Sequence, residues 1–225
     1  MKKIFGILGL LVTVFAFTWI VEPKFASAYN LQNIIRWTSL FGIISIGVAF
    51  VIITGGIDLS VGSLIGLIGC TITLLLADGY SIPVALAMVM ALSLTIGLLH
   101  GLLITRIGLQ PFVVTLCGLL FYRGFARWLT HDQVQGFGTS YEGLRHLAIG
   151  KIPLTDSFSI PIPFFILVFL GSIAALFLNR TIWGRYLLAL GRNEEAARYS
   201  GIQTERMKIL AYVICSGTAG LGGIL

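Results

Sequence analysis

Charged residues are scarce in this chain. They make up 11% of its 225 residues, hydrophobic residues make up 57%, and the mean hydropathy is +0.97. A water-soluble domain carries roughly 25% charged residues, so this composition excludes an ordinary soluble globular protein. Cysteine is also sparse: Cys70, Cys117 and Cys215 lie far apart, each inside an apolar stretch. This spacing excludes a disulfide framework or a cysteine metal site and predicts small buried side chains.

Motifs for bond chemistry are missing as well. No Gly-x-x-x-x-Gly-Lys-Ser/Thr pattern occurs, which excludes ATP hydrolysis by that device. His100, His131 and His146 are dispersed, and the solitary position of His100 predicts a packed, hydrogen-bonded core histidine rather than a proton relay. Asp58 and Ser60 would need a histidine beside them to form a triad, and nothing in the sequence positions one. We therefore expect no catalytic residue, no cofactor and no metal.

The net charge of +6 comes from scattered basic residues without an aromatic-lined basic face, so nucleic-acid binding is not expected. Instead, seven apolar runs have a length suited to membrane spans. They are Ile4 to Val21, Trp37 to Ile57, Leu59 to Ala77, Tyr80 to Thr105, Ile107 to Tyr122, Phe158 to Leu178, and Ile209 to Leu225. These runs predict an all-α, polytopic membrane helical bundle with about seven spans, in one transmembrane domain over residues 1–225.

The two ends of the chain each allow a specific interpretation. Lys2 and Lys3 precede the first apolar run, and Ala26-Ser-Ala28 resembles a signal cleavage site. The run is longer than a usual signal core, which favours an uncleaved first span. The final run lacks a polar flank to anchor a helix end at the interface, so we expect an N-terminal fragment truncated at the C-terminus.

Lysine and arginine predict the orientation, because cytoplasmic loops carry an excess of both. With the N-terminus inside, nine of the fifteen fall on the inner side and six on the outer side. The inner set is Lys2, Lys3, Arg106, Arg180, Arg185, Arg192, Arg198, Arg206 and Lys208, and the outer set is Lys24, Arg36, Arg123, Arg127, Arg145 and Lys151. The count predicts a cytoplasmic N-terminus, an outer loop at residues 123–157 and an inner loop at residues 179–208.

The stretch Val51 to Ser63 places Asp58 between two long uncharged runs. Asp58 is therefore either the tip of a short turn between two spans or a polar group held inside the bilayer. An ionisable residue in this position is a functional candidate. The simpler interpretation is a helix cap, in which the Asp58 carboxylate accepts from the amide of Ser60 or Val61.

The inner loop contains a second motif, Leu190 to Ile202. Asn193 is a natural N-cap, Glu194 and Glu195 occupy the first turn, where the helix dipole favours anions, and Gly201 is a natural C-cap. A helix of about seven residues is unstable alone in water, so it needs a partner surface. Either it packs back on its own membrane ends, or it inserts into another subunit.

Both motifs carry a family resemblance. Gly55 to Ser63 resembles the signature of ABC importer permeases for simple sugars, of the ribose, xylose and galactose type. Leu190 to Ile202 resembles that family's Glu-Ala-Ala-type loop, although Arg192 stands where many relatives have glycine. The signature residues are Gly55, Gly56, Asp58, Ser60, Gly62 and Ser63, and the matching loop residues are Gly191, Asn193, Ala196, Ala197, Gly201 and Ile202.

The resemblance implies a type II ABC importer permease fold in the bacterial inner membrane. It implies a multi-pass subunit that moves a small sugar inward by ATP-driven alternating access and performs no bond chemistry. The implied partners are an ABC ATPase docked on the inner loop (including Glu194 and Glu195), a sugar-binding protein outside, and a second permease subunit, identical or paralogous. Residues 123–157 would meet the binding protein, or else form an interfacial helix anchored by Tyr122 and Trp128.

A sugar path needs scattered hydroxyls and aromatic faces that bind weakly. The candidate lining residues are Ser60, Ser63, Phe112, Thr115 and Phe121. The alternative is that the phenylalanines pack against neighbouring helices. Two other functions remain open: a branched-chain amino-acid ABC permease of related fold, and an ion-coupled secondary carrier. The carrier is disfavoured because the predicted spans hold almost no ionisable groups for a coupling ion.

Overall fold

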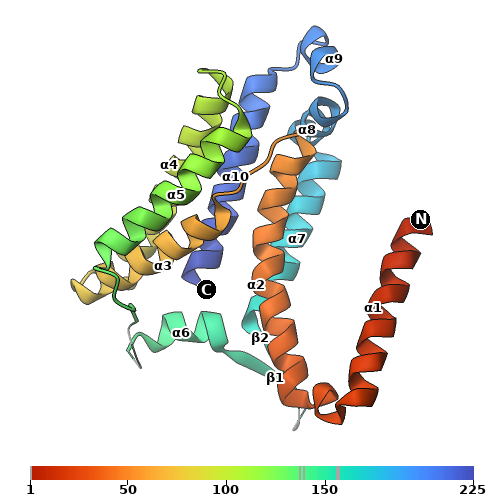
Figure 1. The fold of residues 1–225 in the computed structure, drawn as a ribbon, viewed down its shortest axis with the longest axis vertical. Coiled ribbons are helices and arrows are strands. Elements are labelled where there is room, and N and C mark those ends of the chain that lie inside the picture. The colour runs from red at the N-terminus through yellow and green to blue at the C-terminus, as the bar shows by residue number, and fades with distance from the viewer. Residues whose placement is uncertain (1, 137, 139, 156–157) are drawn as a thin grey trace.

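The structure is a computed structural model, and it describes residues 2–136, 138, 140–155 and 158–225, with side chains from residue 5 onward. Most of the described chain is α-helical (Figure 1). The elements are α1 (Lys2–Val21), the 3-10 helix η1 (Pro23–Ala26), α2 (Ala28–Ile53), α3 (Val61–Ala77), α4 (Ile82–Thr105), α5 (Pro111–Leu129), α6 (Glu142–Ile149), β1 (Lys151–Thr155), β2 (Phe158–Pro161), α7 (Ile162–Arg180), α8 (Ile182–Arg192), α9 (Glu194–Tyr199) and α10 (Thr204–Ile224).

Within these described residues, five helices are long and apolar enough to cross a membrane: α2, α4, α5, α7 and α10. Two shorter apolar helices, Phe5–Val21 and Val61–Ala77, account for the first and third predicted spans. At 17 residues α3 is about 26 Å long, which is less than the hydrocarbon thickness of a typical bilayer. The all-α membrane bundle predicted from the sequence is confirmed.

Helix α10 lies at the centre of the bundle and packs against α2, α3 and α4. Its contact with α4 is close because Gly97 faces it: a Cβ at Gly97 would lie 2.6 Å from the backbone oxygen of Tyr212. Small residues allow helices in lipid to approach in this way. Helix α1 packs on η1 and stands apart from the bundle in Figure 1, with apolar side chains such as Phe17 and Ile20 exposed.

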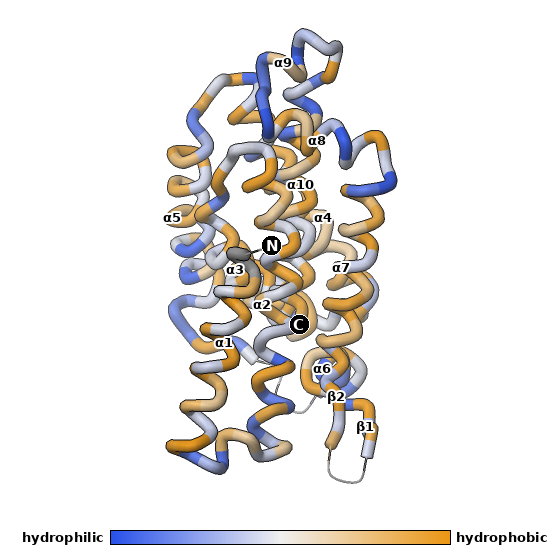
Figure 2. The backbone as a smooth tube through the Cα atoms, turned by 90° about the vertical axis from the view of Figure 1, so that its right-hand side faces the viewer, coloured by the Kyte–Doolittle hydropathy of each residue, from blue (hydrophilic) through white to orange (hydrophobic). Residues whose placement is uncertain are grey.

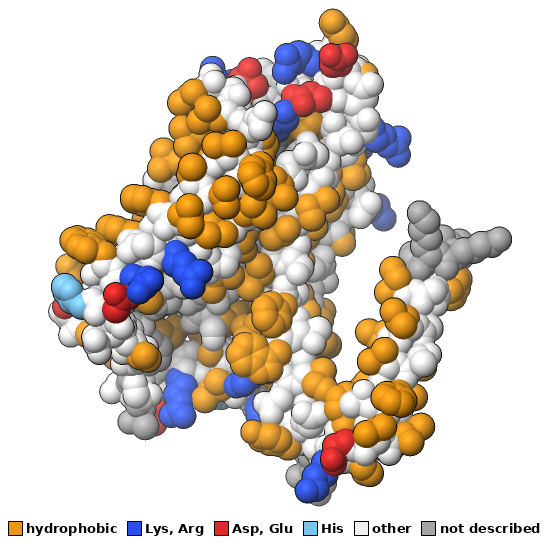
Figure 3. All heavy atoms as spheres, in the orientation of Figure 1, with side chains coloured by type: hydrophobic (Ala, Val, Ile, Leu, Met, Phe, Trp, Pro, Cys, Tyr) orange, Lys and Arg blue, Asp and Glu red, His pale blue; other side chains and the backbone are white. Residues whose placement is uncertain are grey.

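The polar segments gather at the two ends of the bundle, and apolar residues form the belt between them. Figure 2 shows this banding along the backbone, and Figure 3 shows charged side chains clustered around α9 and at the opposite end. One end holds α8, α9 and the connection from α4 to α5, and the other holds η1, α6 and the β1–β2 hairpin (Figure 1). The predicted inner and outer loops thus lie at opposite ends of the molecule.

A two-stranded antiparallel hairpin, with Lys151 opposite Pro161, was not expected. The sixth predicted span began at Phe158, but α7 begins only at Ile162. Pro161 explains the difference, because Ile160 before it favours extended backbone, and Pro163 then lies in the first turn of α7, where proline is tolerated. The hairpin is tied to α2 by Lys151, whose Nζ donates to Gln32 Oε1 at 2.6 Å.

Other predicted boundaries also differ from the structure: the second span begins at Ala28 rather than Trp37, and the last begins at Thr204 rather than Ile209. The second span ends at Ile53 rather than Ile57, because the chain turns at Thr54 and then runs extended. The fifth helix begins at Pro111, a residue suited to the first turn of a helix, and continues past Tyr122 to Leu129. The start of the predicted outer loop is therefore helical, and its last residue, Ser157, lies outside the described residues.

Candidate functional site

The chain between α2 and α3, residues 54–60, leaves the end of the bundle and enters its interior. In Figure 1 this extended stretch descends from the end of α2 beside α8 to the start of α3, which lies well inside the bundle. We call residues 54–60 the linking segment. Non-helical backbone at membrane depth is tolerated where protein surrounds it and its polar groups are satisfied. The turn at its start is satisfied: the Gly55 amide donates to Ile52 O at 2.9 Å and the Gly56 amide to Val51 O at 3.0 Å.

Asp58 lies inside the bundle, with 1% of its side chain exposed. Of the two positions that the sequence left open, the structure has the buried one. Its Oδ1 accepts from the amide of Ser60 at 2.9 Å and from Ser60 Oγ at 2.7 Å. The hydrogen bond expected of a helix cap is thus present through Ser60, although Asp58 lies three residues before Val61, the first residue of α3.

The second oxygen of Asp58 faces a histidine. Oδ2 lies 3.9 Å from Nδ1 of His100 on α4, and His100 is almost fully buried. His100 Nε2 shares a 2.7 Å hydrogen bond with Tyr122 Oη on α5. The expectation of a packed, hydrogen-bonded histidine agrees with this geometry. The expectation that nothing positions a histidine near Asp58 was wrong: α4 brings His100 to it.

This buried cluster has no arrangement for nucleophilic catalysis. Ser60 Oγ donates to Asp58 and has no histidine as its base. A further tyrosine closes the cluster from α10, where Tyr212 Oη donates to the backbone oxygen of Ile57 at 3.0 Å. The sequence offers one signal for this contact, because Asp58 lies between two predicted spans, His100 lies inside another, and such groups tend to pair; it does not show that α4 packs beside Asp58.

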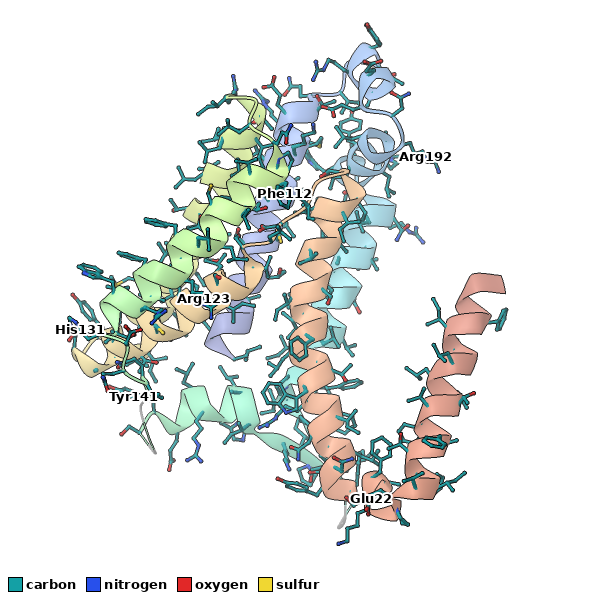
Figure 4. All side chains as sticks on the ribbon, in the orientation of Figure 1. Glu22, Phe112, Arg123, His131, Tyr141 and Arg192 are labelled. Carbon is teal, nitrogen blue, oxygen red and sulfur yellow. The ribbon has the colours of Figure 1, made fainter. Side chains whose placement is uncertain are left out.

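The second motif forms a short helix with the predicted punctuation. Asn193 Oδ1 accepts from the amide of Ala196 at 2.9 Å, and Gly201 has a φ of +83° just beyond α9. Within α9, Ala197 is buried against its own chain whereas Ala196 is exposed. Glu194 is paired with Lys208 on α10, whose Nζ lies 2.7 Å from the carboxylate. Figure 4 shows that α8 and α9 form the end of the molecule, with Arg192 between them.

The two motifs, far apart in the sequence, meet in space. They share a cavity of about 260 Å³, lined by Gly55 and Gly56 from the linking segment, by Gly191 and Asn193 from the second motif, and by Tyr212. The cavity is thus bounded by the turn that leads to Asp58 and by the residues that lead into α9.

Helix α8 lies directly against the end of α2. A Cβ at Gly191 would lie 1.8 Å from the backbone oxygen of Ile53. Any larger residue at this position would force the two helices apart. Gly191 therefore fixes the close contact between the second motif and the start of the linking segment.

A family model described as "Branched-chain amino acid transport system / permease component" matches residues 30–225. The chain belongs to this permease family. The match covers the bundle and both motifs and begins beyond α1. The family resemblance expected from Gly55 to Ser63 and Leu190 to Ile202 is confirmed.

Curated relatives give the same result. Ribose import permease protein RbsC of Escherichia coli strain K12 is 35% identical over 222 residues, covering 98% of this chain and 67% of the relative. The protein of the same name in Bacillus subtilis strain 168 is 32% identical over 226 residues, covering 100% and 68%. Xylose transport system permease protein XylH of Escherichia coli strain K12 is 28% identical over 278 residues, covering 97% and 70%. No solved structure matches this chain significantly.

The permease thus spans about two thirds of the length of its ribose-permease relatives. It is a membrane component of a transport system and not an enzyme.

The candidate lining residues of the sugar path differ in how exposed they are in the structure. Phe112 and Phe121 are exposed on α5, whereas Ser60 and Thr115 are fully buried and Ser63 is partly buried. Cys117, expected to be buried, is also exposed on α5.

Proposed function

We propose that this permease is the membrane subunit of a binding-protein-dependent ABC importer that moves a small sugar into the cytoplasm by ATP-driven alternating access. A second permease subunit, identical or paralogous, would complete the path. The observation that carries the proposal is the 35% identity to a ribose import permease over 98% of the chain. The protein would do no bond chemistry and would provide a wet, weakly binding route for the sugar.

The energy would come from a separate ATPase docked on α8 and α9, in the inner loop 179–208. A six-residue helix such as α9 is too short to be stable alone, and it presents Ala196 and Glu195 to the outside. A small residue such as Ala196 permits close insertion into a groove, and the charges beside it fix the register at the rim. The ATPase contact would extend over Gly191 to Ile202.

The opposite end would lie outside and receive the sugar-binding protein. It carries α6 and β1, within the loop 123–157 assigned to the outer face, and β2 directly after that loop. This end is held to the bundle by Tyr141 on one side, whose Oη donates to Leu76 O at 2.7 Å, and by Lys151 on the other. The excess of lysine and arginine at the α8–α9 end supports a cytoplasmic N-terminus in the bacterial inner membrane.

The sugar path would be lined by residues that are exposed on the surface of a single permease chain. Phe112 and Phe121 are available on α5, and their ring faces suit a neutral polyhydroxyl solute. Ser60 and Thr115 are covered in this conformation and would meet the sugar only after the helices move. Ser63, in the first turn of α3, is partly buried.

The description of the matching family favours a second candidate, import of a branched-chain amino acid. An amino acid carries two opposite charges, whose transfer into a path without paired partners is costly. In the described part of the spans the buried ionisable groups are Asp58 and His100, which face each other. Because these two groups face each other inside one chain, they are less suited to a zwitterion, which favours the sugar.

Transport in proteoliposomes tests the proposal. The full-length permease would be reconstituted with its ATPase and binding protein, and uptake of labelled ribose, xylose and leucine would be measured with ATP on the cytoplasmic side. We expect sugar uptake that disappears when the ATPase's phosphate-binding lysine is replaced. Uptake of leucine without sugar would establish the second candidate, and uptake driven by an ion gradient without ATP would contradict both.

A further inference from the structure

The linking segment joins the two places that an ATP-driven importer must connect. Its first residues, Gly55 and Gly56, share a cavity with the α8–α9 motif, and its inner residue Asp58 lies buried in the bundle. Seven residues, 54–60, cover the distance from this cavity to the first residue of α3. The inference drawn here rests on the proposed function.

At the end of the segment that adjoins α2, the packing leaves no free space to absorb a movement of α8. Gly191 touches the backbone oxygen of Ile53 so closely that even a methyl group would overlap it. Packed interiors have little free space and transmit displacement. A shift of α8 would therefore move the end of α2, where the linking segment begins.

At the end of the segment inside the bundle, side chains from two helices face the segment, and a third helix contacts one of those side chains. Tyr212 on α10 donates to Ile57 O at 3.0 Å, and His100 on α4 faces Asp58. His100 in turn is hydrogen-bonded to Tyr122 on α5. These side chains join the segment to the helices whose relative positions must change if the bundle is to open and close.

One contact in this cluster is unmade. His100 Nδ1 is buried and has no hydrogen-bond partner among the described residues. Its 3.9 Å distance from Asp58 Oδ2 is beyond hydrogen-bond length. A displacement of the segment by about 1 Å would bring the two atoms within hydrogen-bond length. With the proton on Nδ1, Tyr122 Oη donates to Nε2, and a position in which Nδ1 reaches Asp58 would satisfy this buried nitrogen.

We propose that the linking segment carries the movement of α8 and α9 into the bundle, and that Asp58, His100 and Tyr212 are positioning residues that hold its inner end. Motion at the ATPase side then reaches α4, α5 and α10 through Asp58 and Ile57. The three side chains act on transport by fixing where the segment sits, and they need not touch the sugar.

Coupling between transport and ATP hydrolysis tests this proposal. The variants Asp58→Asn, His100→Gln and Tyr212→Phe would be reconstituted as the full permease with its ATPase and binding protein. Each should lower the number of sugars moved per ATP hydrolysed by at least about fivefold, while ATP hydrolysis continues. Asp58→Asn keeps an oxygen that accepts from Ser60, so its fold should persist. Asp58→Glu, which keeps a carboxylate, should move more sugars per ATP hydrolysed than Asp58→Asn does.

Matched controls make the same chemical changes elsewhere. Asp78→Asn and Tyr80→Phe alter exposed residues in the turn between α3 and α4 and should leave the ratio unchanged. An unchanged ratio in the three cluster variants would overturn the proposal, as would parallel losses of transport and hydrolysis. A wild-type system without ATP-dependent sugar uptake would contradict the proposed function instead, so the two failures are distinguishable.

Thiol labelling provides a second measurement that does not depend on the cluster variants. Ile57 is 42% exposed, so Ile57→Cys in a Cys117→Ser background accepts a water-soluble reagent. Its labelling rate should differ between the ATP-free and the trapped ATP-bound complex. Glu22→Cys, at an exposed position just beyond the first predicted span, is the matched control and should be labelled at the same rate in both states. Identical rates at residue 57 in the two states would show that the segment does not move.

Discussion

Asp58 and Glu194 are both carboxylates close to a basic group, but their surroundings differ. The side chain of Asp58 is 1% exposed, accepts from Ser60, and lies 3.9 Å from His100. The side chain of Glu194 is 39% exposed and pairs with Lys208 at 2.7 Å at the end of the bundle. The ion pair is thus the exposed one, and the buried carboxylate relies on neutral hydrogen-bond donors.

This difference in burial suits the two carboxylates to different roles. A charge in apolar surroundings is expensive unless its partners are in place, so small changes around Asp58 have large effects. An exposed pair is screened by water and contributes little. The interior cluster is therefore suited to fixing the position of backbone, and the α9 end is suited to reversible contact with another subunit.

Asp58→Leu should have the largest effect on the permease itself. Leucine removes the acceptor for the Ser60 amide and hydroxyl and leaves two buried donors unsatisfied. We expect a loss of stability of about 1–3 kcal/mol and no transport. Thermal unfolding in detergent and sugar uptake would measure both. Asp58→Asn should fold better than Asp58→Leu, and full activity in both would remove Asp58 from the functional residues.

Ala196→Trp should separate docking from folding. Ala196 is exposed on α9, so an indole there would overfill a groove on the ATPase and leave the permease intact. Co-purification of the ATPase should fall about tenfold or more, an interface loss of about 1.4 kcal/mol. Ala197→Trp is the contrasting change, since Ala197 is buried in its own chain and the indole would disturb α9 itself. Undiminished co-purification with Ala196→Trp would contradict docking on this helix.

Gly191→Ala should have an intermediate effect. The added methyl would meet the backbone oxygen of Ile53, which cannot move aside as a side-chain tip can, so α8 must shift. Overpacking of this kind costs about 1–3 kcal/mol. Gly66→Ala is the matched control in α3, because its methyl would meet nothing within 4 Å among the described atoms. Equal transport and equal thermal midpoints in the two variants would show that the contact between α8 and α2 is unimportant.

Local features of this fold could be predicted from the sequence, and contacts between distant elements could not. The cap formed by Asn193 depends on residues three positions apart, so the expected hydrogen bond to Ala196 is present. The apolar runs gave the helices because their length and composition decide them. The approach of His100 to Asp58 depends on how α4 packs beside the linking segment, which no local pattern records. The hairpin before α7 was not predicted, because the apolar run from Phe158 was assigned to a span although it contains prolines that favour extended backbone.

Glu194→Gln should have the smallest effect, and it makes the same chemical change as Asp58→Asn. Glutamine keeps an oxygen that can accept from Lys208, and an exposed ion pair of this kind contributes only about 0.5 kcal/mol. The thermal midpoint should hardly change, and transport should stay within about twofold of the wild type.

Because salt screens exposed charges, any loss of transport in Glu194→Gln should diminish further at high ionic strength. The loss of coupling in Asp58→Asn should persist there, because Asp58 is shielded from solvent ions. Measuring both variants at low and high salt compares the buried and the exposed carboxylate directly. A salt-independent loss in Glu194→Gln as large as that in Asp58→Asn would show that burial does not distinguish them.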